Sequence, residues 1–429
     1  MSEFSEMNGV FAINKPKGIT SSQFLSKIQY IFTNSKNFSK ELAQLRGAKI
    51  EQIQKEGGKA SRRKLRKVEK VKMGHGGTLD PLATGVLVVG VGKGTKLLQN
   101  YLNGSVKIYE TEALFGSETT TGDIEGEVLI KSGFNHITQS DIDLIPSKFI
   151  GDIKQTPPIF SALKLNGKPL YEYARNNIPL PKQLEPRNVK VFELEIFKDT
   201  LSKDHNYGDN DDIVKNKIDD EMIKNLQNNP TLNEEFHKIY LSKQYCEQKN
   251  LSPNDKVDPG TPIDQDDSTT SSLPPLLHFK TKVSSGTYIR SLISDIGKSL
   301  RSNAYMVKLI RVKQAEWELG QNVFELRDFE DRDERVWGKV LKQVLNTEKG
   351  EDIKDLNKIF ETTEDEFKDI IQQEKEQKLQ EKAKQEHAQQ EQQEQREQNH
   401  EDKVEAKIDQ ETQSFNGIHN EHKRKIDEV

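Results

Sequence analysis

The pattern of apolar and polar positions divides the chain into an ordered part and a polar end. Apolar runs of strand length, bounded by turn residues, recur along the ordered part. They lie at 10–14, 86–89, 106–115, 276–283 and 305–312. Apolar residues at helical spacing occur between them, at 20–32 and from 289 onward. The pattern therefore predicts an α+β fold in which helices flank a sheet.

Residues 347–429 differ from the preceding chain, because Gln, Glu and Lys dominate and apolar residues are scarce. Such a segment cannot build a core, so we expect it to be disordered or a lone solvated helix. Two further polar stretches, 36–72 and 199–275, are interpreted as insertions, and the second is expected to add little to the core. The predicted organisation is one domain over 1–346, interrupted by two insertions and followed by the tail.

The charge is unevenly distributed along the chain. The whole chain carries a net charge of −5, but residues 1–200 and 276–346 together carry +12, whereas 201–275 and 347–429 carry −17. A basic ordered part suits a polyanionic partner, because neutralisation of phosphates acts locally.

Cysteine and histidine usage argues against a metal site. The single cysteine, Cys246, excludes an internal disulfide and a cysteine-rich zinc site, and the nine histidines show no ligand spacing. No apolar run approaches the ~20 residues of a membrane span. We therefore expect an intracellular protein without a metal or a membrane partner.

The segment 72–85 carries the candidate chemistry. It holds Asp80 in a loop rich in glycine, histidine and proline, directly before the apolar run 86–89. Pro81 pushes Asp80 out of the helical region, and the glycines let the backbone approach a ligand. An ordinary Asp-Pro turn is the alternative interpretation of that dipeptide.

The segment 90–96, Gly-Val-Gly-Lys-Gly-Thr-Lys, has the look of a phosphate-binding loop. That interpretation fails, because Gly94 stands where Ser or Thr must bind magnesium and Leu87 stands where the first glycine is required.

Residues 74–87, Gly-His-Gly-Gly-Thr-Leu-Asp-Pro-Leu-Ala-Thr-Gly-Val-Leu, closely resemble the catalytic loop of the TruB family of tRNA pseudouridine synthases. Further blocks resemble motifs of that family in the right order. They are Ile13–Ser21, Lys107–Tyr109 with the turn Thr119–Gly126, Gln155–Arg175, and Ser284–Leu292 with Tyr305–Val312. The resemblance covers roughly residues 8–34, 71–198 and 276–320, and the long stretch before the loop is similar to the eukaryotic, fungal-type branch. It implies a mainly antiparallel central sheet, the pseudouridine synthase fold.

The resemblance also implies roles for individual residues. Asp80 is the catalytic nucleophile, Arg290 pairs with it, and Tyr109 stacks on the uracil and assists proton removal. Four more residues in the matched motifs are assigned to substrate binding, namely His75, Tyr288, Leu309 and Lys15. Ile310 departs from the family's Leu-Arg-Arg segment, which weakens the transfer of an arginine role to that strand.

The implied reaction is isomerisation of uridine to pseudouridine in the T-loop of tRNA, at the position conventionally called 55. The C1′–N1 bond must break and C5 must join C1′, which requires a nucleophilic carboxylate and a closed pocket but no cofactor. Attack of Asp80 at C1′ and at C6 are both compatible with the residues. A tRNA-folding chaperone without chemistry is the rival function, since it would need the basic part but not Asp80.

The resemblance implies tRNA as the partner, with T-loop-like sites in mRNA as a second class, and a monomeric protein. The nucleus is the expected compartment, with the mitochondrion and the cytoplasm as further candidates. Residues 59–72 are the most basic patch of the chain, with eight basic residues against Glu69. Nuclear import, RNA contact and a solvated helix face are the three interpretations, and we favour import with some RNA contact.

Overall fold

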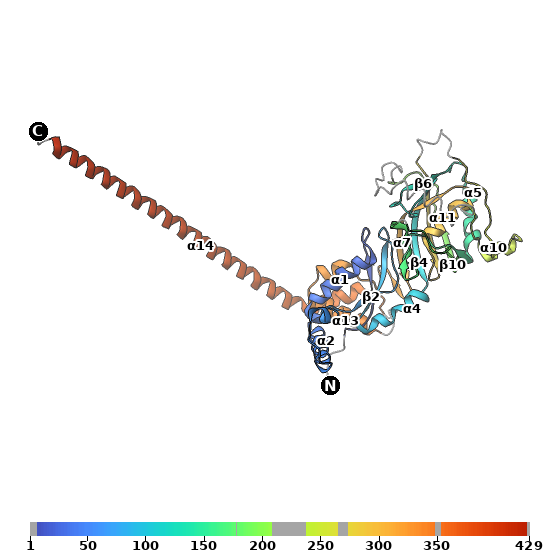
Figure 1. Cartoon of the computed structure of the whole chain (residues 1–429), viewed down its shortest axis with the longest axis horizontal. Coiled ribbons are helices and arrows are strands. Elements are labelled where there is room, and N and C mark those ends of the chain that lie inside the picture. The colour runs from blue at the N-terminus through green and yellow to red at the C-terminus, as the bar shows by residue number, and fades with distance from the viewer. Residues whose placement is uncertain (1–6, 177, 208–236, 265–272, 348–352, 427–429) are drawn as a thin grey trace. The chain divides into compact units, whose positions relative to one another are not determined.

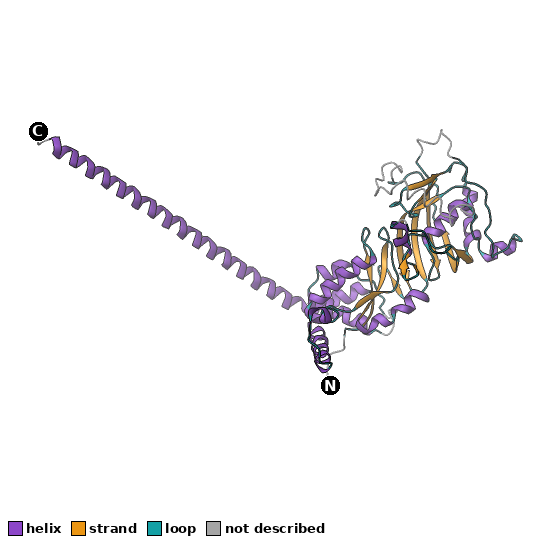
Figure 2. Cartoon of the chain, in the orientation of Figure 1, coloured by secondary structure: helices purple, strands orange, loops and turns teal. Residues whose placement is uncertain are grey.

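The computed structural model describes residues 7–176, 178–207, 237–264, 273–347 and 353–426 (Figure 1). The chain divides into two units, Met1–Glu361 and Thr362–Val429. The first unit is built on a nine-stranded sheet with the order β1-β3-β12-β4-β11-β10-β7, to which β2 and β13 are added beside β3 and β12 (Figure 2). Neighbouring strands are antiparallel except β3 and β12. The predicted α+β class with a mainly antiparallel central sheet is confirmed.

The strands of this sheet are β1 (Gly9–Lys15), β2 (Met73–His75), β3 (Thr84–Val91), β4 (Lys107–Phe115), β7 (Gly151–Gln155), β10 (Arg187–Ile196), β11 (Leu276–Val283), β12 (Ala304–Gln314) and β13 (Trp317–Glu318). Two small two-stranded sheets are formed by β5 (Ser117–Thr119) with β6 (Val128–Lys131), and by β8 (Lys164–Leu165) with β9 (Lys168–Pro169).

The helices that precede β10 are α1 (Ser21–Asn34), α2 (Lys36–Lys55), α3 (Arg62–Leu65), the 3-10 turn η1 (Gly92–Lys96), α4 (Leu98–Asn103), α5 (Gln139–Asp143), α6 (Ile145–Phe149) and α7 (Leu170–Arg175). Those that follow are α10 (Lys243–Gln248), α11 (Ile289–Ser299), α12 (Leu326–Glu330), α13 (Glu334–Asn346) and α14 (Leu356–Ile426). No described helix is both long enough and apolar enough to cross a membrane.

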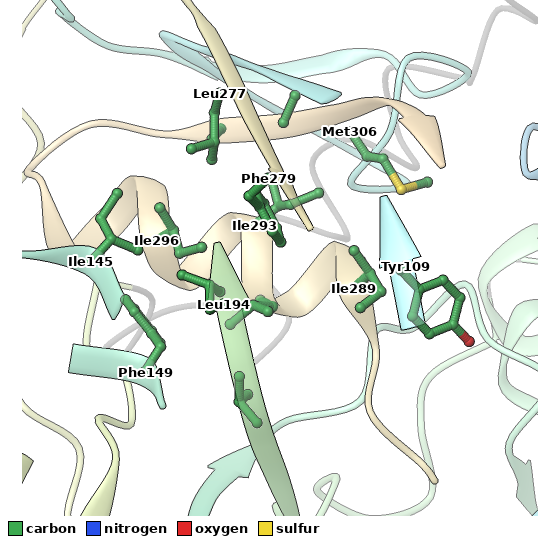
Figure 3. Packing of buried hydrophobic residues seen from close by; sticks show 14 of the residues in the cluster. Tyr109, Ile145, Phe149, Leu194, Leu277, Phe279, Ile289, Ile293, Ile296 and Met306 are labelled. Atoms are coloured by element: carbon green, nitrogen blue, oxygen red, sulfur yellow. The ribbon is translucent and has the colours of Figure 1, made fainter. Parts of the chain in front are cut away.

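One face of the sheet is covered by α11. Ile289, Ile293 and Ile296 recur at helical spacing on α11 and are buried against strand residues such as Phe279 and Met306 (Figure 3). On β4, buried and half-buried residues alternate, as expected of a strand with one face in the core. The N-terminal end of α11 is thereby fixed over the centre of the sheet, which sets the position of Arg290.

The first insertion is less polar in the structure than its composition suggests. Residues 36–55 form the helix α2, which buries Phe38 and Ile53. Phe38 stacks on Phe32 of α1 with ring centroids 5.0 Å apart. A buried aromatic pair of this kind is worth about 1 kcal/mol beyond its area. The first half of this insertion is therefore attached to the domain core.

The expectation that residues 199–275 add little to the core is wrong for the part that the structure describes. Ile239, Leu241 and Cys246 are buried in the same cluster as α11. Ser242 caps α10 by accepting a hydrogen bond from the backbone N–H of Tyr245. These few apolar residues surround a helix of one and a half turns, which is too short to produce a sustained period. Residues 208–236 and 265–272 lie outside the described residues.

The predicted tail is helical where it is described, and its first turn belongs to the first unit. Ile353, Leu356 and Phe360 are buried, and the ring of Phe360 meets that of Phe324 edge-on at 5.7 Å. The division between the units accordingly lies beyond the predicted boundary at residue 346. These apolar residues recur at helical spacing, a local signal that the polar composition of the tail obscures.

Candidate active site

The structure brings Asp80 and Arg290 together, although they are far apart in the sequence. Asp80 lies in the loop between β2 and β3, and Arg290 lies in the first turn of α11. Arg290 Nε donates to Asp80 Oδ2 at 2.9 Å, and Nη2 donates to Oδ1 at 3.2 Å. Such a two-pronged contact fixes the plane of the carboxylate as well as its distance. The Arg290 side chain is 6% exposed and that of Asp80 is 31% exposed, so the carboxylate still faces solvent.

Arg290 is also held by two backbone carbonyls. Its Nη1 donates to the carbonyl of Thr121 at 2.6 Å, and its Nη2 donates to the carbonyl of Phe160 at 2.9 Å. These carbonyls belong to two of the motif blocks, the turn after β5 and the Pro-Pro segment. Both blocks therefore act on the site by orienting the guanidinium, which in turn orients Asp80.

Asp123 is a second carboxylate near this pair that the sequence analysis missed. It is buried, and its Oδ1 accepts hydrogen bonds from Thr121 Oγ1 at 2.6 Å and from the backbone N–H of Glu125 at 3.0 Å. Burial raises its pKa, an effect that the nearby Arg290 charge opposes. Asp123 thus holds the turn whose carbonyl binds Arg290. The Thr-Gly-Asp-Ile-Glu-Gly spacing, typical of an aspartate that closes its own turn, could have indicated it.

Tyr109 and Leu309 lie in the same buried cluster as Leu79 and Ile289. Leu79 precedes Asp80, and Ile289 precedes Arg290, so both side chains are placed beside the ion pair. Figure 3 shows Tyr109 next to Ile289. The aromatic ring and the leucine therefore supply apolar surface next to the carboxylate.

Tyr288 is the N-cap residue of α11 and is partly exposed. The buried side chain of Gln155 holds its backbone from both sides. Gln155 Oε1 accepts from the Tyr288 N–H at 3.0 Å, and Gln155 Nε2 donates to the Tyr288 carbonyl at 3.3 Å. Gln155, which begins the Pro-Pro block, was not singled out in the sequence and fixes the start of the helix that carries Arg290.

His75 ends β2, five positions before Asp80, and is half-buried. Burial lowers its pKa, and the charge of Arg311 lowers it further. A histidine whose pKa lies below its ordinary value is neutral at pH 7. His75 can therefore offer a hydrogen bond or a ring face to a ligand, but not a charge.

The structure places Lys15 differently from the prediction of substrate binding. Lys15 is fully buried, and its Nζ donates to the carbonyls of Pro16 and Ile19 at 2.7 Å and of Pro81 at 3.3 Å. Burial lowers the pKa of Lys15 to about 8, and the charge of Asp80 offsets this only in part. Its ammonium group therefore supports the backbone next to Asp80 instead of reaching into solvent.

Removal of this buried amine should change how stability depends on pH. The lowered pKa means that between about pH 8 and 10.5 the unfolded chain binds more protons than the folded chain, so wild-type stability rises with pH there. Methionine does not titrate. We expect the unfolding free energy of wild type minus that of Lys15→Met to grow by about 2 kcal/mol between about pH 7 and pH 9.5.

Urea unfolding of both proteins at the two pH values measures this difference. The exposed neighbour Lys17 provides a matched Lys17→Met control for removal of a positive charge. A difference that stays constant or shrinks with pH would contradict the burial of a charged Lys15 amine.

Arg311 is the residue whose importance the sequence least revealed. It is fully buried on β12, where its Nε donates to the carbonyl of Val86 at 2.6 Å and its Nη2 to that of Gly77 at 3.4 Å. Gly85 lies at φ +108°, and a Cβ there would stand 2.3 Å from the Arg311 carbonyl. The catalytic loop is thus clamped to β12 on both sides of Asp80. The departure at Ile310 does not remove this arginine.

A cavity of about 200 Å³ adjoins Arg290. The turn after β5 and the Pro-Pro segment line it, and the second insertion contributes Tyr240 and Lys256. Burial raises the pKa of Glu118 and raises that of Asp295 to about 7, while the positive charge of Lys298 opposes both shifts. The insertion therefore reaches the surroundings of the candidate site.

Comparison with known proteins agrees with this arrangement. The model of the TruB family pseudouridylate synthase N-terminal domain matches residues 62–206. The chain is 52% identical over 349 residues to tRNA pseudouridine synthase 4 of Saccharomyces cerevisiae, which covers 79% of this chain and 85% of that protein. It is 36% identical over 345 residues to tRNA pseudouridine synthase 4 of Schizosaccharomyces pombe, covering 75% and 82%.

A bacterial relative matches over a shorter length. Identity to tRNA pseudouridine synthase B of Francisella philomiragia is 36% over 193 residues, which covers 45% of this chain and 51% of that protein. The two yeast proteins, by contrast, match across most of both chains. The chain therefore belongs to the TruB family of tRNA pseudouridine synthases, in its fungal-type branch, as the sequence motifs predicted, and it is an isomerase.

Proposed function

We propose that the protein isomerises uridine to pseudouridine in the T-loop of tRNA, at the position conventionally called 55, with Asp80 as the nucleophile. The observation that carries this proposal is the two-pronged contact between Asp80 and the buried Arg290. A buried guanidinium favours the ionised form of a carboxylate, and only that form is nucleophilic. The relatives described above are named tRNA pseudouridine synthases.

The reaction makes limited demands on the protein. The C1′–N1 bond breaks, the uracil turns, and a C5–C1′ bond forms. The C5 proton leaves and N1 becomes protonated, so no electrons are exchanged. What the site must supply is a fixed carboxylate and a place in which the detached base is retained.

The remaining site residues suit a flipped-out nucleotide. The target base must leave its stack, because its two faces are otherwise out of reach. Tyr109 stacks on the uracil and assists removal of the C5 proton, and Leu309 forms an apolar wall. Tyr288 and His75 are partly exposed at the rim and contact the RNA.

The experiment that tests this function is incubation with an unmodified tRNA transcript, with binding and pseudouridine measured on the same sample. Pseudouridine at the T-loop uridine supports the enzyme. Binding without product would favour the chaperone, which needs the basic surface but not Asp80. Neither binding nor product would leave an RNA-independent scaffold.

We further propose that T-loop-like sites in mRNA are a second substrate class and that the protein acts as a monomer in the nucleus. The basic patch 59–72 supports the nuclear assignment, with the mitochondrion and cytoplasm as further compartments. Within it, α3 buries Leu65 while its basic side chains are exposed. A short basic cluster of this kind suits an import receptor or phosphates.

Replacement of this cluster by alanine should reduce nuclear accumulation, because import depends on it. The residues to change are Arg62, Arg63, Lys64, Arg66 and Lys67. Microscopy of the tagged protein measures the first effect, and the salt dependence of tRNA binding measures any RNA contact, at up to ~0.9 in log–log slope per lost contact. A matched control replaces five cations of α14, namely Lys375, Lys378, Lys382, Lys384 and Arg396. Unchanged accumulation and an unchanged slope would leave only the solvated helix face.

A further inference from the structure

Helix α2 and the turn η1 line a groove of about 710 Å³. Four exposed lysines line it, Lys40 from α2, Lys93 and Lys96 from η1, and Lys72 from the segment before β2. Glu41 is the one acidic side chain among the described residues of the lining. The groove therefore concentrates positive charge on a part of the surface to which the site described above does not extend.

The η1 side of the groove is rigid. Gly92 lies at φ +55°, and a Cβ there would stand 1.9 Å from Asn8 Oδ1. That oxygen accepts a hydrogen bond from the backbone N–H of Lys93 at 2.6 Å. The Gly92 N–H donates to the carbonyl of Lys72 at 2.8 Å. The segments that carry Lys72 and Lys93 are thus fixed side by side.

The α2 side is equally well anchored. Ser35 caps the helix by accepting from the Asn37 N–H at 3.0 Å, and Asn37 Nδ2 donates to the carbonyl of Glu334 at 2.9 Å. Phe38 is buried against Phe32, two residues before Lys40. Charges that are held on such a frame lose little backbone entropy when they bind a ligand.

The groove lies at the opposite end of β3 from the catalytic loop. Thr84, at the loop end of the strand, pairs with Ile310, and Val91, at the other end, lines the groove. Seven strand steps separate them, which corresponds to about 23 Å. A nucleotide held at Asp80 cannot reach that far, but a tRNA whose T-loop is bound at Asp80 can.

We infer that this groove binds the phosphate backbone of the helical part of tRNA, away from the target loop. The inference rests on the proposed function and extends it to a second contact region. Lysines are point charges that neutralise phosphates without reading sequence. A protein partner is disfavoured, because the centres of protein interfaces are depleted in lysine. The basic patch 59–72 ends in the groove at Lys72, which extends the same positive surface.

The test compares two RNA ligands and two variants of the full-length protein. The groove variant is Lys40→Ala, Lys93→Ala, Lys96→Ala. The matched control changes three lysines of α2 that do not line the groove, Lys36→Ala, Lys49→Ala, Lys55→Ala. Binding of a full-length tRNA transcript and of an isolated T-arm stem-loop is measured at several salt concentrations, and circular dichroism checks that the helices remain folded.

We expect the groove variant to bind full-length tRNA at least ten-fold more weakly, with a log–log salt slope flatter by about 2 to 3. The T-arm stem-loop should lose much less affinity, and the control variant should behave as wild type. Equal losses on both RNAs, or no loss on either, would overturn the inference. Loss of binding to anionic lipid vesicles with tRNA binding unchanged would assign the groove to a membrane surface instead.

Failure of the proposed function is distinguishable from failure of this inference. If wild-type protein forms no pseudouridine in either RNA, the proposed function is wrong whatever the groove variant does. If it forms pseudouridine while the groove variant binds full-length tRNA as tightly as wild type, only the groove assignment is wrong.

Discussion

Arg290→Lys should lose at least about two orders of magnitude in kcat, equivalent to about 3 kcal/mol of transition-state stabilisation. The substitution keeps a positive charge but cannot keep the geometry. A lysine offers a single ammonium group in place of the planar fork that contacts both oxygens of Asp80 and the carbonyls of Thr121 and Phe160. The carboxylate would keep a nearby charge but lose its orientation. Single-turnover formation of pseudouridine with enzyme in excess measures the effect without interference from product release.

The chain offers a matched control for this substitution. Arg335 makes a two-pronged contact with Asp333, with both distances 2.8 Å, at a position far more exposed than Arg290. Arg335→Lys should leave the rate near that of wild type, because an exposed ion pair contributes little. A rate near wild type for Arg290→Lys as well would show that the contact with Asp80 is incidental.

The sequence motifs predicted the centre of the candidate site because each lies within a short stretch of chain. Asp80 stands out by its place between glycines and a buried strand, and Arg290 by its place at the start of a helix. Their pairing across 210 positions could be predicted only from the resemblance to a family. Periodicity predicts which face of an element is buried, but not which two elements meet.

The residues that support the site were not predictable, because their roles depend on burial. Lys15 and Arg311 look like ordinary basic residues in the sequence, yet both are fully buried and bind loop carbonyls. Whether a cation faces solvent or fills a polar gap is decided by tertiary packing. Asp123 and Gln155 are similar cases, since each acts on the backbone next to Arg290 or its carbonyl partner.

Composition misled the analysis where a few apolar residues decide the structure. In the second insertion, Ile239, Leu241 and Cys246 are buried although their surroundings are polar. In the tail, Ile353 and Phe360 attach its beginning to the first unit. An average over a long window dilutes such anchors, whereas burying one large apolar side chain stabilises the fold by about 2 kcal/mol.

The central claim is that Asp80 performs the chemistry, and Asp80→Asn tests it most directly. The amide keeps the size of the carboxylate but is not a nucleophile. The measurement is pseudouridine at the T-loop uridine of an unmodified tRNA transcript under single-turnover conditions, with tRNA affinity determined on the same preparation. Asp152→Asn, at an exposed aspartate on β7, is the matched control.

We predict that Asp80→Asn binds tRNA within a few-fold of wild type and forms no detectable pseudouridine, while Asp152→Asn is as active as wild type. Formation of pseudouridine by Asp80→Asn at a rate close to that of wild type would contradict the assignment of Asp80 as the nucleophile.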